Sequence, residues 1–170
     1  CTVQATDNQS EVSALVTFTV NTAPKAMFSI DRVDVIVAGD SSRLDDGDTI
    51  DAKIGDTISF KIKLHNDYSG DSDLNEDVKI KSVTANVDIE DWDNWDSNDD
   101  ISSISADKYG TLTVDAGTIP MDTSDGSHNV VITVEGTDGE TGYKYKLTLS
   151  ADLDVTKTDE AIRISGLTLG

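Results

Sequence analysis

Apolar and polar residues alternate with a period of two along most of the chain. The clearest run is 57–64, in which every even position is apolar and every odd position is polar. Residues 130–134 and 143–151 repeat the pattern, and the polar loop 137–142 between them predicts a hairpin. Such alternation is typical of strands with one face on a core and the other in water. No stretch has a convincing helical period.

Two of the predicted strands change phase midway. In residues 78–89 the apolar positions are even up to Ile80 and odd from Val83, and residues 27–37 show a similar break near Asp31 and Arg32. A fixed register would turn half of each strand to the wrong face. We therefore expect a β-bulge near Ser82, or a strand that crosses from one sheet to the other.

Further short strands are predicted between polar turns. The candidates are 49–53, 101–106, 111–114 and 161–169, and residues 92–100 are expected to form a loop with at most one short turn. The pairs Asp46-Gly47, Gly55-Asp56 and Asp125-Gly126 are turn signals. Strands this frequent predict an all-β sandwich, with a core made mostly of valine, isoleucine and leucine.

The charge of the chain is strongly acidic. Its 170 residues carry 33 acidic and 13 basic side chains, for a formal net charge of −20, and 27 of the acids are aspartate. This surface repels nucleic acid and anionic lipid, so neither is an expected partner. Aspartate favours turns and hard cations, which points to acidic loops that either bind calcium or serve solubility in salty water.

The chain has one cysteine, Cys1, and no segment that would insert in a membrane. No apolar run approaches the roughly 20 residues that a membrane-spanning helix needs. With no second cysteine, an intrachain disulfide is excluded. Cys1 is therefore a boundary of the expressed segment, a lipid-modified residue or half of a bridge to another chain.

The first 24 residues resemble the last two strands and the linker of a bacterial or archaeal immunoglobulin-like (Ig-like) repeat. An "A-x-D-N" turn, a strand of small residues and an "N-x-A-P" linker carry this resemblance. The rest of the chain resembles the Ig-like adhesion-type modules of archaeal S-layer and other cell-surface proteins. The segments that carry this second resemblance are 45–50, 54–66, 78–89, 119–122 and 126–132.

The resemblance implies an Ig-like β-sandwich with an N-terminal hairpin or donor-strand segment. We expect terminal strands of a preceding module, or a donor segment, at 1–22, a linker at 23–26 and the sandwich at 27–158. Residues 159–170 then form a connecting strand to a following module or subunit. An isolated hairpin is marginal in water and an edge strand seeks a partner sheet. Like subunits joined through these strands are the expected partners.

Two acidic loops are candidate calcium sites. Asp71, Asp73, Asn75 and Asp77 place oxygens at alternate positions, although the loop lacks the glycine and the bidentate glutamate of an EF-hand. Asp91, Asp93 and Asp96 belong to the densest cluster, whose carboxylates repel one another unless cations intervene. The alternative for both loops is a solvated acidic surface.

A few other side chains are candidates for binding or modification. Trp92 and Trp95 either form a sugar-stacking platform, anchor a long loop or lie in a subunit interface. Asn8 starts an N-glycosylation sequon. His65 and His128 lack metal-ligand spacing, so each is expected to be an ordinary core or surface histidine. Residues 122–126 predict only a turn, and no motif of a catalytic nucleophile or phosphate loop is present.

These features predict a non-enzymatic, extracellular structural protein. It would be a subunit or repeat of a cell-surface layer, filament or pilus that assembles through its terminal strands and is stiffened by Ca²⁺. The rival hypothesis is an adhesin or carbohydrate-binding module that holds cell-surface glycans with the Trp92/Trp95 loop. A lipoprotein anchored through Cys1 is a third.

Overall fold

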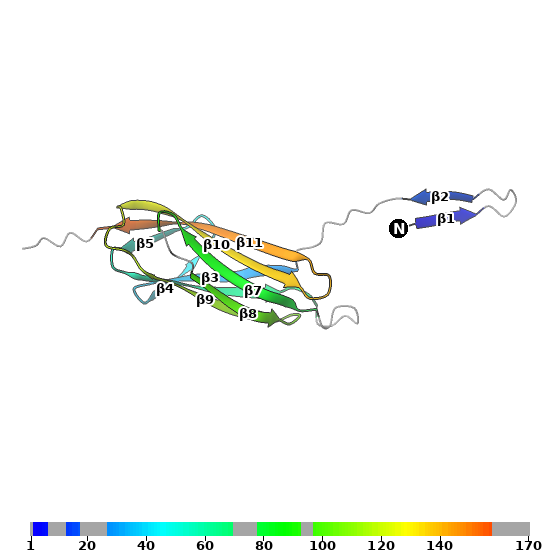
Figure 1. Cartoon of the computed structure of the whole chain (residues 1–170), viewed down its shortest axis with the longest axis horizontal. Coiled ribbons are helices and arrows are strands. Elements are labelled where there is room, and N and C mark those ends of the chain that lie inside the picture. Colours follow the sequence, from blue (N-terminus) through cyan, green and yellow to red (C-terminus); the bar gives the residue numbers. More distant parts are fainter. Residues whose placement is uncertain (1, 7–12, 18–26, 70–77, 93–96, 158–170) are drawn as a thin grey trace, which may run out of the picture.

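The fold is all-β and contains two packed sheets, as the alternation predicts (Figure 1). A computed structural model describes residues 2–6, 13–17, 27–69, 78–92 and 97–157. In the first part of the chain, β1 (Thr2–Thr6) and β2 (Ser13–Thr17) pair as an antiparallel two-stranded sheet of their own. This is the N-terminal hairpin expected from the sequence.

Within residues 27–69, 78–92 and 97–157, nine further strands form the sandwich. The four-stranded sheet has the order β4-β3-β6-β9, with β3 (Phe28–Val37), β4 (Asp40–Leu44), β6 (Thr57–Asn66) and β9 (Tyr109–Thr118). The five-stranded sheet has the order β5-β11-β10-β7-β8, with β5 (Thr49–Lys53), β7 (Ile80–Ile89), β8 (Ser97–Ile104), β10 (Gly126–Asp138) and β11 (Lys144–Thr156).

The connections between these strands have the immunoglobulin-type arrangement. β6 and β9 are neighbours in one sheet, as strands B and E are, while β7, β10 and β11 lie side by side in the other, as C, F and G are. The chain changes sheet between β4 and β5, and β5 then pairs with β11 in parallel. The prediction of an Ig-like sandwich is therefore confirmed.

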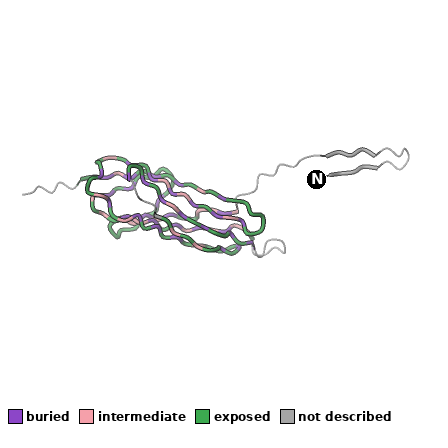
Figure 2. Tube along the Cα trace, in the orientation of Figure 1, coloured by how far each residue is buried: buried purple, intermediate pink, exposed green. Residues whose placement is uncertain are grey.

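Buried and exposed residues alternate along the strands (Figure 2), and the buried hydrophobic residues of both sheets belong to one core cluster. Valine, isoleucine and leucine make up most of this core, with Phe28 and Phe60 fully buried among them. Apolar surface removed from water contributes about 25 cal/mol per Å², so this layer is the main source of stability. The strand register brings these side chains inward.

Both predicted phase breaks are β-bulges. The pairing of β10 with β7 shifts by one residue at Ser82 of β7, which has a φ of +49°. The pairing of β3 with β6 shifts between Ile30 and Arg32, as predicted near Asp31. In each strand the extra residue restores the inward direction of the apolar side chains that follow.

Two strands depart from the sequence prediction. β4 is polar and was not predicted; it exists because Ala38 and Gly39, with φ of +51° and +96°, make a tight hairpin turn after β3. β8 begins at Ser97, inside the predicted acidic loop, so the prediction of a loop up to residue 100 is wrong. There the Asp99 carboxylate accepts hydrogen bonds from the backbone N–H groups of Asp100 and Thr113, which suits a polar edge strand.

The chain enters and leaves the sandwich at opposite ends (Figure 1). At the first end, called the entry end, β3 begins beside the end of β6, and Tyr68 is hydrogen-bonded to Asp138 at the end of β10. β11 starts at this end and finishes beside Gly126, where the Lys157 N–H donates to the Asp125 carboxylate. That second end, called the exit end, holds the candidate site.

Candidate functional site

A cavity of about 410 Å³ opens at the exit end of the sandwich. It lies between the turn that follows β7 and the connection from β9 to β10. Its lining residues are Asp91, Trp92, Pro120, Asp122, Thr123, Ser124 and His128. Three separate stretches of the chain thus meet around one hollow, which we call the exit pocket.

His128 lies in β10 at the inner side of the exit pocket. The residue is 3% exposed, and its Nε2–H donates to the backbone carbonyl of Ser124 at 3.1 Å. A carbonyl only accepts, so this bond places the proton on Nε2 and leaves a lone pair on Nδ1 of the neutral ring. That Nδ1 is buried without a hydrogen bond from the described residues, and it lies 3.8 Å from a carboxylate oxygen of Asp91.

A sharp turn after β7 positions Asp91 and Trp92. Asp91 adopts a φ of +67°, and the Glu90 N–H donates to the carbonyl of Asn129, which ties the turn to β10. The Asp91 side chain is 75% exposed, whereas Trp92 is 9% exposed. The centroid of the Trp92 ring lies 6.3 Å from the centroid of the His128 ring. Trp92 therefore anchors this turn on the sandwich, one of the alternatives drawn from the sequence.

The connection from β9 to β10 supplies the other wall. The Thr123 N–H donates to the carbonyl of Pro120 and closes a turn over 120–123, so the turn begins two residues before the one expected at 122–126. Thr123 is 7% exposed, and its hydroxyl is buried with no hydrogen-bond partner among the described residues. Asp122, next to it, is exposed at the rim. The exit pocket thus combines two carboxylates at its mouth with two unpaired polar atoms inside.

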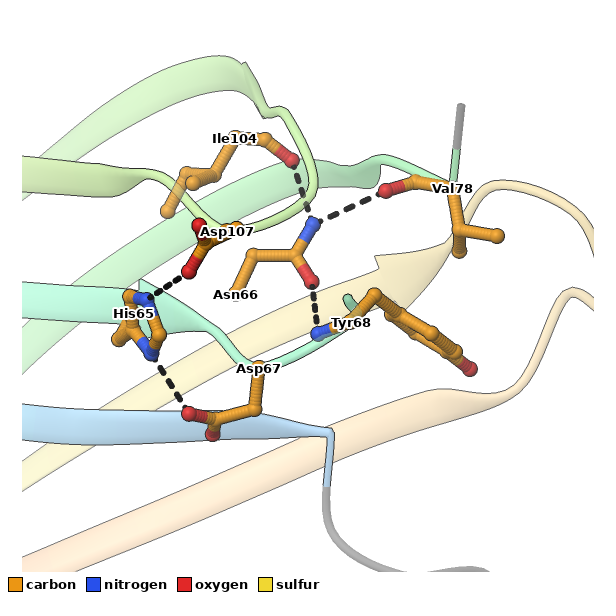
Figure 3. Close-up of polar contacts among 7 residues, drawn as sticks. All are labelled: His65, Asn66, Asp67, Tyr68, Val78, Ile104 and Asp107. Atoms are coloured by element: carbon orange, nitrogen blue, oxygen red, sulfur yellow. Dashed lines mark hydrogen bonds and ion pairs between the residues drawn. The ribbon is translucent and has the colours of Figure 1, made fainter. Parts of the chain in front are cut away.

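The entry end holds a different kind of polar cluster, in which Asn66 is fully paired (Figure 3). Asn66 is 0% exposed, and its side-chain N–H groups donate to the carbonyls of Val78 and Ile104. Its side-chain oxygen accepts the Tyr68 N–H. One amide therefore joins the end of β6 to the beginning of β7 and the end of β8.

His65 is half-buried beside Asn66, between two carboxylates (Figure 3). Its Nδ1 is 2.6 Å from Asp67 and its Nε2 is 3.6 Å from Asp107. The ring also packs on Tyr109, whose ring contacts the Lys63 ammonium at 3.8 Å from the centroid. This arrangement is a surface network of ion pairs and ring contacts.

Tyr68 and Asp138 complete the entry end. The Tyr68 hydroxyl donates to the Asp138 carboxylate, and burial together with this bond raises the pKa of Tyr68. Burial acts to raise the pKa of Asp138 as well. However, the N–H groups of Thr141 and Glu140 and the Tyr68 hydroxyl all donate to it, and their combined effect lowers its pKa below the ordinary value. Asp138 is thus a buried carboxylate kept charged by its donors.

Most residues singled out in the sequence lie outside the described residues. These are Cys1, Asn8, Asp71, Asp73, Asn75, Asp77, Asp93, Trp95 and Asp96. Asp91 and Trp92 are described, and the fold brings them together at the exit pocket. Within the described ranges, no group of three or more histidine, cysteine, aspartate or glutamate side chains is arranged to hold a metal ion.

Sequence reasoning missed the role of His128 and Thr123 in this pocket. His128 was expected to be an ordinary core or surface histidine, and it is indeed buried, but beside a cavity. The available signal was its position two residues after the predicted Asp125-Gly126 turn, near the start of β10 at the end of the sandwich. Its meeting with Asp91 joins residues 37 positions apart, which no local pattern reveals.

No family model and no curated protein matches this chain. Among solved structures, it is similar to a family 123 glycoside hydrolase from Clostridium perfringens, analysed for glycolipid glycan hydrolysis, with 17% identity and a TM-score of 0.42. The match covers 65% of this chain and 23% of that chain, so the chain spans less than a quarter of the enzyme. This likeness carries no argument about activity. Among the described residues there is also no helix long and apolar enough to cross a membrane.

Proposed function

We propose that this chain is a non-enzymatic structural module of an extracellular assembly, a surface layer, filament or pilus. The observation that carries the proposal is the path of the chain through the sandwich. It enters at Met27 beside the end of β6 and leaves at Lys157 beside Asp125, at the opposite end (Figure 1). A module with this path continues a chain in a line and keeps neighbours at a fixed spacing.

The edges of the sandwich also support a structural role. At the β9 edge, the Thr113 N–H donates a hydrogen bond to the Asp99 carboxylate. The edge strands β4 and β5 are only five residues each. Short or capped edges prevent uncontrolled pairing of sheets. Contact with other subunits would then depend on dedicated segments, for which the β1–β2 hairpin is the candidate, because it forms a sheet separate from the sandwich.

The charge of the chain suits a cation-dependent assembly outside the cell. A net charge of −20 repels like subunits until cations neutralise it. Ca²⁺ is the proposed counterion because carboxylate oxygens are its preferred ligands. The acidic segments 71–77 and 91–96 are the proposed places where it acts.

Negative-stain electron microscopy of the purified full chain, in calcium and then in chelator, tests this proposal. We expect filaments or sheets in calcium that disappear in chelator. Val16→Pro places a residue without an N–H inside the strand that pairs Val16 with Val3, and should abolish assembly, while Val16→Thr keeps a strand-forming residue and should preserve it. Monodisperse particles in both conditions would contradict the proposal.

A further inference from the structure

We propose that the exit pocket binds a single neutral or amino sugar residue through His128, Thr123, Asp91 and Asp122. This inference goes beyond the structural role and stands independently of it. A structural module with this site would hold a sugar residue at one end of its sandwich.

The size and the walls of the exit pocket fit one sugar ring. Small-ligand sites occupy about 300–1,000 Å³ and combine apolar walls with a few convergent polar groups. The cavity of about 410 Å³ lies at the low end of that range. Trp92 and Pro120 contribute apolar surface, and the remaining lining residues are polar.

The inner part of the pocket contains two polar atoms that need a partner. The Nδ1 of His128 and the hydroxyl oxygen of Thr123 are buried and make no hydrogen bond within the described part of the chain. Burying such groups without a partner costs stability, so each calls for an explanation, and a ligand that supplies the missing bond is one. A sugar hydroxyl both donates and accepts, so it can pair with either atom.

The mouth of the pocket is rich in acceptors. The Asp91 carboxylate lies 3.8 Å from the His128 Nδ1, and no described residue donates to that nitrogen. The carboxylate of Asp122 adds another acceptor at the rim. The matching ligand is therefore rich in donors, which describes neighbouring hydroxyl groups or an ammonium group.

Charge narrows the class of sugar. Two carboxylates line the pocket, and the whole chain has a net charge of −20. A sugar acid would bring a third negative charge into this site and be repelled. A hexosamine would instead place its ammonium beside Asp91. We therefore expect neutral sugars to bind, amino sugars to bind more tightly and uronic acids to be rejected.

A proton or a metal ion would also satisfy the unpaired nitrogen of His128. A protonated His128 would donate from Nδ1 to Asp91 and need no ligand. A divalent transition metal would be held by His128 and Asp91, although within the described part of the chain no third side chain joins them in a metal-binding group. A cavity of about 410 Å³ is also far larger than an ion requires. NMR distinguishes both cases from sugar binding.

NMR titration of the full chain tests the proposal directly. The probes are methyl glucoside, methyl galactoside, methyl mannoside and glucosamine, with methyl glucuronide as the rejected control. For a ligand of this size we expect a dissociation constant on the order of 1 mM. The shifts should centre on His128, Trp92 and Thr123, and the His128 nitrogens should report a neutral ring with the proton on Nε2.

Matched variants separate binding from folding. Thr123→Val and His128→Gln keep the side-chain size and should each weaken sugar binding at least tenfold. Thr111→Val and His65→Gln make the same changes outside the pocket and should leave binding unchanged. If His128→Gln fails to fold, Thr123→Val alone decides, because its hydroxyl has no partner to lose among the described residues.

Three results would overturn the proposal. The first is that no probe shifts the pocket resonances. The second is an imidazolium signal from His128 at neutral pH, with both ring nitrogens protonated. The third is tight binding of Zn²⁺ that His128→Gln abolishes, with no response to any sugar. Assembly of the full chain in calcium is measured separately, so failure of this proposal leaves the structural proposal untouched.

Discussion

Four buried polar residues in the described part of the chain divide between the two ends of the sandwich. Asn66 and Asp138 lie at the entry end, and Thr123 and His128 lie at the exit end. The first pair makes hydrogen bonds to several neighbours, whereas each member of the second pair has a buried polar atom without a partner in the described part of the chain. A buried polar network stabilises a fold when it is satisfied, and an unsatisfied atom is costly unless a ligand pairs with it. The entry end is therefore a structural joint, while the exit end keeps two buried polar atoms, unpaired among the described residues, for the proposed ligand.

Replacing Asn66 by alanine should be strongly destabilising. The change leaves the carbonyls of Val78 and Ile104 and the Tyr68 N–H without their partner inside the fold. We expect a loss of about 2–4 kcal/mol in the free energy of unfolding, measured by urea denaturation. The exposed control Asn98→Ala should change it by less than about 0.5 kcal/mol. Equal effects of the two variants would refute the role given to Asn66.

Asp138 should make the stability of the protein depend on acid pH. Its pKa is lowered in the fold. Its contribution to the free energy of unfolding is therefore complete above the unfolded pKa of about 3.9, and it is lost as the pH falls through the folded pKa. Asp138→Asn should therefore be less stable than the wild type at pH 7, with a gap that narrows below about pH 4.

Urea unfolding at several pH values measures this gap. Asp152→Asn, an exposed change on β11, serves as the control and should follow the wild type at every pH. A gap between wild type and Asp138→Asn that stays constant down to about pH 2 would show that Asp138 acts only through packing.

At the scale of single residues, sequence reasoning reached Trp92 and Asp91 but not their setting. The acid-rich pattern drew attention to both. The burial of Trp92 and its approach to His128 depend on how β7 and β10 pair, which brings Glu90 beside Asn129. Long-range pairing of this kind leaves no local periodicity to detect.

The strands themselves were largely predictable, because a buried face imposes a period of two. β6, β10 and β11 follow the alternation, and the two phase breaks mark true bulges. β4 and the first half of β8 escaped prediction because backbone pairing to a neighbour holds them in place. Polar edge strands of this type carry almost no sequence signal.

The bulge at Ser82 predicts opposite effects of two substitutions. With a φ of +49°, Ser82 occupies a region that glycine tolerates and β-branched residues do not. Ser82→Gly should be neutral or stabilising by up to about 1 kcal/mol, and Ser82→Val should destabilise by about 1–2 kcal/mol. Chemical denaturation measures both effects. Ser103→Val, in the paired edge strand β8, is the control and should be close to neutral. A loss of stability in Ser103→Val as large as that in Ser82→Val would argue against backbone strain at Ser82.

At the scale of the whole molecule, the acidic surface should make stability depend on salt. Self-repulsion of a net charge of −20 opposes the compact state, and added ions screen it. Raising NaCl from about 20 mM to about 500 mM, with chelator present, should stabilise by on the order of 1 kcal/mol and raise Tm by about 2–4 °C. Asp152→Lys reduces the net charge and should lessen the response. A Tm that falls or stays fixed would show that repulsion is unimportant.

The opposite placement of entry and exit also decides how the sandwich would respond to tension. A pull on Met27 and Lys157 acts at the start of β3 and the end of β11, and both strands run along the direction of that pull. Each strand would have to slide past its neighbours. The force is then shared by all the hydrogen bonds of that strand, which must break together rather than one after another. The parallel pair of β5 and β11 shares this load, because β5 is joined through β4 to β3. Forced rupture is governed by the rate of unfolding, so this shear geometry makes the sandwich an element that resists extension.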